Sequence, residues 1–136
     1  MPIELGLVSE SLQQNDKVSA AWVFGSVATG KDRPDSDIDI AVLFIKGLDK
    51  HVRFDMRLAI AAELTDLTGR EVDVIDMQAA PLLLQHQVRR FGYLLFEKDH
   101  TYRVNFDVKS RREFFDFLPR LEKRNRQIIN KVLEGK

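Results

Sequence analysis

The sequence predicts an α+β fold, in which a small mixed β-sheet is flanked by helices and followed by a C-terminal amphipathic helical tail. Short apolar runs of strand length alternate with longer segments whose apolar residues recur at helical spacing. Glycine, proline and asparagine fall between these segments, where turns are expected. With 136 residues, 44% of them hydrophobic, the chain is large enough for one buried core and leaves little room for a second.

The first half of the chain predicts the order helix, strand, loop, strand. Residues 3–14 have apolar positions close to helical spacing, and the preceding proline suits a first helical turn. The run VSAAWVF at 18–24 is typical of a strand that is covered on both faces. Residues 25–36 contain two glycines, a proline and small polar residues, so we expect a loop with about one helical turn. The run DIDIAVLFI at 37–45 predicts the second strand.

The second half continues the alternation and ends in the tail. In order, we expect a helix over 50–68 ended by Gly69, a strand over 71–77, a helix over 80–91 started by Pro81 and ended by Gly92, and a strand over 93–97. Helix formers then dominate, with one apolar stripe made of Phe114, Phe117, Leu118, Leu121, Ile128 and Val132. Pro119 is expected to kink this helix or to start a new one.

Charge divides the chain into an acidic body and a basic tail. Residues 1–99 contain 11 Lys and Arg against 16 Asp and Glu, whereas residues 100–136 contain 10 against 5. An acidic body argues against a general nucleic-acid-binding surface, which would be basic. The tail is a C-terminal extension that either belongs to the same compact unit or docks a partner.

Two absences in the sequence bear on its location. The chain has no cysteine, which excludes disulfides, thiolate metal sites and cysteine nucleophiles. It has neither a secretory signal pattern nor an apolar run near the roughly 20 residues that cross a bilayer. We therefore expect a cytoplasmic protein that does not bind membranes.

The most informative pattern is G-S, then ten residues, then D-I-D, framed by two apolar strands. Asp37 and Asp39 face the same side of an extended strand, because side chains there alternate. Carboxylates roughly 6 to 7 Å apart repel each other and need a cation, and Mg²⁺ prefers such ligands together with nucleotide phosphates. Aspartates at the start of a strand are otherwise often only solvated, so the hypothesis depends on the whole pattern.

This order of elements with G-S-x₁₀-D-x-D resembles the nucleotidyltransferase superfamily of the DNA polymerase β type, and its short length resembles the minimal nucleotidyltransferases. The resemblance implies that Gly25 and Ser26 bind the triphosphate and that Asp37 and Asp39 ligate Mg²⁺. Glycine lets the backbone approach a phosphate closely, and serine can donate its hydroxyl and amide hydrogens. Residues 1–99 would form the nucleotidyltransferase domain.

A third carboxylate is expected in this family, completing a site for two metal ions. Asp73 is our candidate, because an acidic side chain in the middle of an apolar strand is costly without a cation or donor. It would ligate the second ion and act as the base for the acceptor hydroxyl. Glu71 shares its face and is the reserve candidate, whereas Asp76 faces the other way and is expected to cap the following helix.

One position departs from the family pattern. Many minimal members carry a basic residue directly after the Gly-Ser pair, where this chain has Val27. Lys31 and Arg33, in the loop that follows, are the candidates to neutralise the γ-phosphate in its place. Exposed loop cations also commonly contact only water.

The second half narrows the resemblance. Residues 79–99 and 102–126 are similar to the MntA-like antitoxins, which are paired with HEPN-domain RNase toxins. This resemblance implies a hetero-oligomeric complex with the toxin and transfer of AMP from ATP to a toxin tyrosine. Two alternatives remain: transfer to a small-molecule hydroxyl, for which the chain has little length to hold an acceptor, and a non-catalytic antitoxin that only masks its partner.

Overall fold

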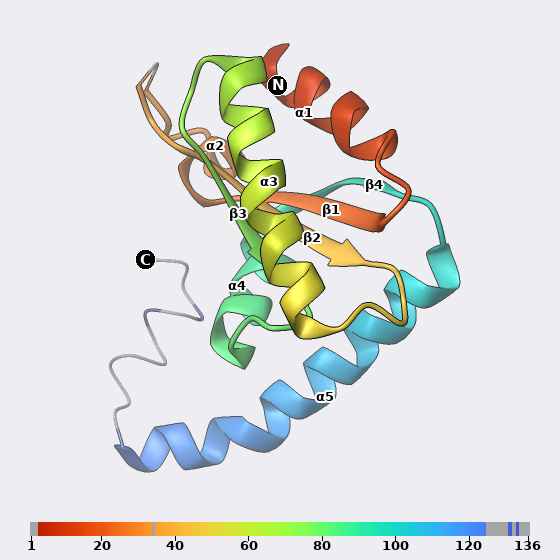
Figure 1. The fold of residues 1–136 in the computed structure, drawn as a ribbon. Helices are drawn as coiled ribbons and strands as arrows, with labels where there is room; N and C mark the ends of the chain where they lie inside the picture. Colours follow the sequence, from red (N-terminus) through yellow and green to blue (C-terminus); the bar gives the residue numbers. More distant parts are fainter. Residues whose placement is uncertain (1–2, 34, 125–130, 132, 134–136) are drawn as a thin grey trace.

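The computed structural model describes residues 3–33, 35–124, 131 and 133, which form five helices and four strands in strict alternation (Figure 1). In chain order the elements are α1 (Ile3–Gln13), β1 (Val18–Phe24), α2 (Gly25–Thr29), β2 (Ile38–Phe44), α3 (Lys50–Thr68), β3 (Val72–Asp76), α4 (Leu82–Phe91), β4 (Tyr93–Glu97) and α5 (His100–Arg124). The predicted helices and strands are present, with ends within two residues of those expected. The expected loop over 25–36 begins with the short helix α2.

The strands form one mixed sheet in the order β3-β2-β1-β4. β1 is antiparallel to both β2 and β4, whereas β2 and β3 are parallel and are connected through α3. The parallel register pairs Ile38 with Val72 and Asp39 with Asp73. The predicted mixed sheet is therefore confirmed, and its register brings two of the predicted site aspartates side by side.

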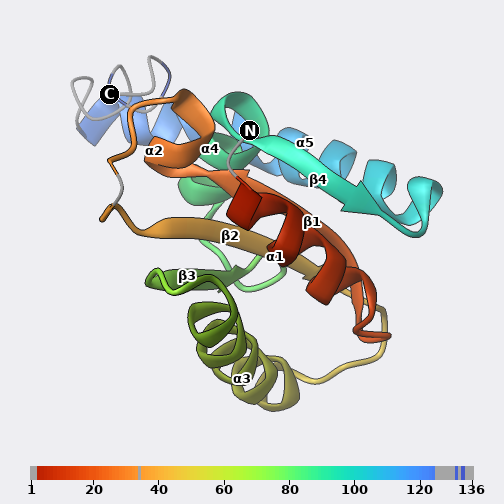
Figure 2. The ribbon, with the colours of Figure 1, turned by 90° about the horizontal axis from the view of Figure 1, so that it is seen from above.

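The sheet lies between two layers of helices, α1 and α3 on one side and α4 and α5 on the other (Figure 2). The larger apolar cluster fills the α1 and α3 side, and it includes Leu5, Leu64 and the strand residues Ile38 and Ile40. Because side chains alternate along β2, Asp39 points to the opposite side, towards the α4 and α5 layer.

α3 covers the outer edge of β3. The Thr65 hydroxyl accepts a hydrogen bond from the Val72 amide at 3.0 Å, and the Arg57 guanidinium donates one to the Val74 carbonyl at 3.3 Å. Side chains of α3 therefore bond backbone groups of β3 that point away from the sheet. This protects the edge from pairing with another strand.

α5 packs on α4 through an aromatic stack and a polar cluster. Phe114 is fully buried, and its ring lies 4.1 Å from the nearly parallel ring of His86. Gln85 donates a hydrogen bond to the Met77 carbonyl at 3.0 Å and accepts one from the Ser110 hydroxyl at 2.5 Å. These contacts join the first half of α5 to the rest of the molecule.

α5 continues through Pro119 to Arg124, so the alternative that a new helix starts at this proline is wrong. Pro119 is exposed, and the carbonyl that it leaves without a helical donor can bond to water. Of the predicted apolar stripe, the Leu121 side chain and the residues Ile128 and Val132 lie outside the described part. Within that part, none of the helices is both long and apolar enough to cross a membrane.

Candidate active site

Gly25 joins β1 to α2 in a backbone conformation that side chains disfavour. Its φ is 72°, and a Cβ at this position would lie 3.1 Å from Cγ of Asp39 and closer still to its Oδ2. The approach follows from the antiparallel pairing of Phe24 with Asp39. The glycine therefore turns the chain and also leaves the space that the carboxylate occupies.

Ser26 and Val27 follow in the first turn of α2, with different surroundings. Ser26 is half-buried, and no side chain caps the start of this helix. The amides of this turn are therefore not bonded to a capping side chain. Val27 is only 5% exposed and belongs to the larger apolar cluster. The position after the Gly-Ser pair, where a basic residue is expected from the family pattern, therefore carries a valine that packs in the core.

The predicted aspartates lie at the N-terminal ends of the parallel strands β2 and β3. Asp39 is the second residue of β2 and is half-buried, and Asp73 is the second residue of β3 and is exposed. They are paired across strands that lie about 4.8 Å apart. Asp37 is exposed and directly precedes β2, so the strand begins one residue later than expected.

The electrostatics of this corner centre on Asp39. Burial raises the pKa of its carboxyl, and the negative charges of Asp73 and Asp37 raise it further, to about 6. The Asp39 carboxyl therefore resists ionisation, because it is desolvated and two negative charges lie near it. An arrangement of this kind is typical of a cation-binding or catalytic site.

Arg70 holds the loop that leads into Asp37, a role that the sequence did not suggest. Its guanidinium donates hydrogen bonds to the Ser36 carbonyl at 2.7 and 3.1 Å and to the Arg33 carbonyl at 3.3 Å. It also lies 3.5 Å from Asp32. This role can be inferred only once the strand register is known. Ile38 pairs with Val72, and the same register continued back by two residues places Arg70 beside Ser36.

The other candidate residues lie around this corner. Lys31 is exposed directly after α2, and its amide donates to the Ser26 carbonyl at 2.9 Å. Arg33 is exposed further along the same loop. Glu71 is exposed immediately before β3, where its carbonyl accepts the amide hydrogen of Ile38. The backbone of Lys31 therefore lies beside the Gly25-Ser26 turn.

Asp76 does not cap α4, and that expectation is wrong. Its carboxylate lies 3.2 Å from the Arg53 guanidinium of α3 and accepts the Gln78 amide at 3.0 Å. Pro81 holds the N-cap of α4 without a side-chain hydrogen bond. Asp76 reaches a cation and a turn amide directly, whereas α4 begins only at Leu82, six residues later. Burial nevertheless raises its pKa, while Arg53 and the turn amides lower it.

A family model described as polymerase beta, nucleotidyltransferase, matches residues 8–101. Among curated proteins, the chain is 35% identical over 80 residues to "Protein adenylyltransferase MntA" of Shewanella oneidensis, covering 59% of this chain and 55% of that protein. It is 33% identical over 98 residues to "Probable protein adenylyltransferase MntA" of Haemophilus influenzae, covering 72% and 83%. The chain thus matches about half of the length of the first relative and most of the second.

Two solved structures resemble almost the whole chain. A crystal structure described as a toxin-antitoxin with AMP-PNP has 26% identity and a TM-score of 0.65, over 96% of this chain and 97% of that one. A chain of a structure described as tri-AMPylated Shewanella oneidensis HEPN toxin in complex with MNT antitoxin has 25% identity and a TM-score of 0.61, over 95% of this chain and 98% of that one. The chain therefore belongs to the polymerase beta family of nucleotidyltransferases and, within it, to the MntA-like proteins.

Proposed function

We propose that this protein is a Mg²⁺-dependent protein adenylyltransferase, which transfers AMP from ATP to a tyrosine of a HEPN-domain RNase toxin and so neutralises it. The observation that carries the proposal is the corner in which Gly25 leaves room for Asp39 beside Asp73. The curated relatives are named protein adenylyltransferases, and the solved relatives include a complex with an AMPylated toxin. A partner that cleaves RNA would place both proteins in the cytoplasm.

The carboxylates of this corner fit a hard divalent cation. Asp37, Asp39 and Asp73 offer only oxygen ligands, and burial together with the negative charges of Asp73 and Asp37 raises the pKa of Asp39. In the described part of the chain, no three acidic or histidine side chains are already gathered closely enough to hold an ion. Binding would therefore draw the two exposed aspartates towards Asp39. When bound, Mg²⁺ would neutralise charge on the phosphate oxygens.

The residues can be assigned roles in one displacement. Ser26 and the first amides of α2 would hold the outer phosphates, with Lys31 or Arg33 adding positive charge. Asp73 would accept the proton of the tyrosine hydroxyl. The phenolic oxygen then bonds to the α-phosphorus, the bond to the α,β-bridging oxygen breaks, and pyrophosphate leaves with that electron pair. The attached AMP would block RNA binding by its charge and volume.

The test is a transfer assay with a HEPN-domain toxin encoded beside this protein. With ATP and Mg²⁺, mass spectrometry should find one or more AMP groups on toxin tyrosines, and RNase activity should fall as they appear. The variant Asp39→Asn should bind the toxin but leave it unmodified. Omitting Mg²⁺ should have the same effect as that variant.

Two outcomes would contradict the proposal. Full inhibition of the RNase by the wild-type protein and by Asp39→Asn alike, without any change in the toxin's mass, would establish a masking antitoxin instead. Transfer to a small-molecule hydroxyl with no modification of the toxin would identify a different acceptor. The alternatives are separated because the toxin's mass and its RNase activity are measured in the same sample.

A further inference from the structure

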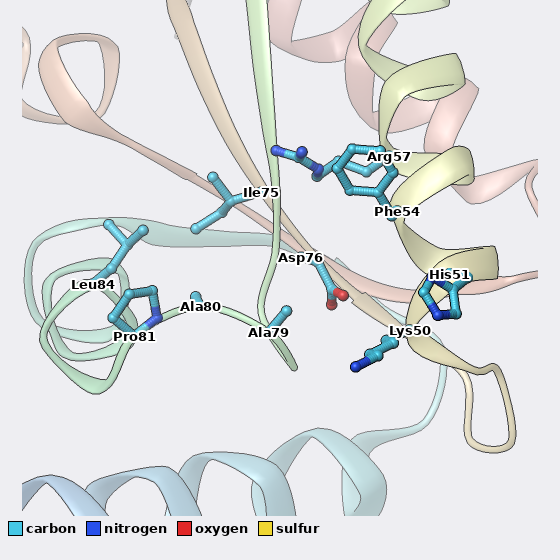
Figure 3. Close-up of a pocket in the computed structure, with 10 residues that line it drawn as sticks. All are labelled: Lys50, His51, Phe54, Arg57, Ile75, Asp76, Ala79, Ala80, Pro81 and Leu84. Carbon is cyan, nitrogen blue, oxygen red and sulfur yellow. The ribbon is translucent and has the colours of Figure 1, made fainter.

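A pocket of about 450 Å³ lies at the outer edge of β3, outside the corner that holds the aspartates (Figure 3). The apolar walls come from Ile75 of β3, Phe54 of α3, Leu84 of α4 and Pro81, which directly precedes α4. Phe54 is 51% exposed, and together with the other walls it forms one contiguous apolar surface that is open to solvent, the kind that can mark an interaction site. A surface of this kind is expected to receive an apolar group from another molecule.

The rim of the pocket is basic. Lys50 and His51, both exposed, and Arg57 line it together with a single carboxylate, Asp76. That carboxylate is already engaged, because Arg53 lies 3.2 Å from it. The free charge at the rim is therefore positive, which favours an apolar group with acidic neighbours.

Arg57 is held in place within this rim. Its guanidinium lies 5.1 Å from the centre of the Phe54 ring and donates a hydrogen bond to the Val74 carbonyl. Figure 3 shows Arg57 and Phe54 together on the α3 side of β3, with Ile75 and Leu84 on the other side. The pocket is thus a groove with a fixed wall on each side of the strand edge.

The groove and the aspartate corner share one strand. Ile75 lies two residues after Asp73, on the same face of β3, a step of about 6.6 Å. Across the sheet the order runs from the Gly25 turn after β1, through Asp39 on β2, to Asp73 on β3 and then to the groove. An in-line displacement needs the attacking hydroxyl and the leaving pyrophosphate on opposite sides of the phosphorus. With the outer phosphates held at the Gly25 turn, as proposed above, the acceptor would approach from the β3 side.

We propose that this groove is the acceptor-polypeptide subsite: it binds an apolar side chain, flanked by acidic residues, in the toxin segment that carries the target tyrosine. The inference rests on the proposed function, because it assumes that the acceptor is a protein. It goes further by naming the surface and the chemistry that select that protein. Phe54 and Leu84 would provide the apolar contact, and Lys50 the charge.

The test compares two exposed apolar residues of α3. Phe54→Ala should raise KM for the HEPN-domain toxin roughly tenfold, the cost of losing one well-placed aromatic contact. KM for ATP and kcat at saturating toxin should not change. Leu67, 45% exposed and not among the groove residues, is the matched control, and Leu67→Ala should leave both KM values as they are. Circular dichroism should confirm that both variants fold.

A charge comparison supports the assignment independently. Lys50→Glu should raise KM for the toxin, with a larger effect at low salt, whereas Lys17→Glu, at an exposed position before β1 that does not line the groove, should not. An unchanged KM for the toxin in both Phe54→Ala and Lys50→Glu would overturn the inference, as would an equal rise in KM for ATP. If the wild-type protein modifies no toxin, it is the proposed function that fails. The two failures are distinguishable, because KM values for the variants can be measured only if the wild-type protein and the variants modify the toxin.

Discussion

Gly25 lies so close to Asp39 that any side chain at position 25 would overlap the Asp39 carboxylate. Gly25→Ala should therefore displace the Asp39 carboxylate and lower the rate of AMP transfer about a hundredfold, since small misplacements of reacting groups have effects of this size. The left-handed backbone conformation should cost a further 1–2 kcal/mol, roughly, in the free energy of unfolding. Transfer is measured by mass spectrometry and unfolding by urea titration.

Gly30 provides the matched control for this prediction. Its φ is 73°, nearly the same as that of Gly25, but a Cβ there would meet nothing within 4 Å. Gly30→Ala should lose a similar free energy of unfolding and keep its transfer rate. Equal activity losses in both variants would show that backbone strain, rather than contact with Asp39, is responsible.

The raised pKa of Asp39 predicts that its negative charge, which the proposed binding of Mg²⁺ requires, destabilises the metal-free protein. Because the pKa rises from 3.8 to about 6 on folding, this group's stabilising contribution is present below about pH 4 and is lost as pH rises through 6. The full shift would correspond to about 3 kcal/mol, and solvent screening of the half-buried group reduces this to the order of 1 kcal/mol. Asp39→Asn should therefore melt a few degrees higher at pH 8 in EDTA.

The pH dependence distinguishes this effect from an ordinary change in packing. The advantage of Asp39→Asn should vanish near pH 4, where the wild-type carboxyl is protonated as well. Asp66→Asn, at an exposed position of α3, should not raise the melting temperature at either pH. A constant difference in melting temperature between pH 4 and pH 8 would contradict the electrostatic explanation.

Local pattern was sufficient to predict most of the fold. The strands 18–24 and 93–97 have the predicted ends, because each apolar run is bounded by residues that favour turns or end helices. Gly92 does follow α4, as predicted, but for a different reason. Its φ is −85°, and a Cβ there would lie 2.5 Å from the Val23 carbonyl oxygen, so space rather than a left-handed cap requires glycine.

What the pattern missed depends on contacts between distant segments. Asp76 was assigned to the helix that follows it in sequence, but its partner Arg53 lies on the preceding helix. The role of Arg70 follows from strand register, and that of Val27 from the core on which α2 packs. Residue spacing predicts which aspartates form the site, whereas the residues that hold those aspartates in place are visible only in the tertiary structure.

Phe114 and Phe115 are neighbours that test whether α5 belongs to the core or only meets a partner. Phe114 is fully buried against His86, whereas Phe115 is 54% exposed. Phe114→Ala should lose about 3 kcal/mol or more of unfolding free energy, and Phe115→Ala less than about 0.5. If the tail docks the toxin, Phe115→Ala should weaken toxin binding in calorimetry without changing KM for ATP. Equal destabilisation by both substitutions would contradict the described packing of α5.

The planar guanidinium of Arg70 donates hydrogen bonds to two carbonyls of the loop before Asp37. Arg70→Lys keeps the charge but cannot reproduce this fork, so the loop should hold Asp37 less firmly. We expect roughly tenfold slower transfer at low Mg²⁺ and partial recovery at high Mg²⁺, because a misplaced ligand weakens ion binding. Arg112→Lys on exposed α5 should change neither quantity. A slower rate that higher Mg²⁺ does not restore would show that Arg70 acts on the fold as a whole and not by positioning Asp37.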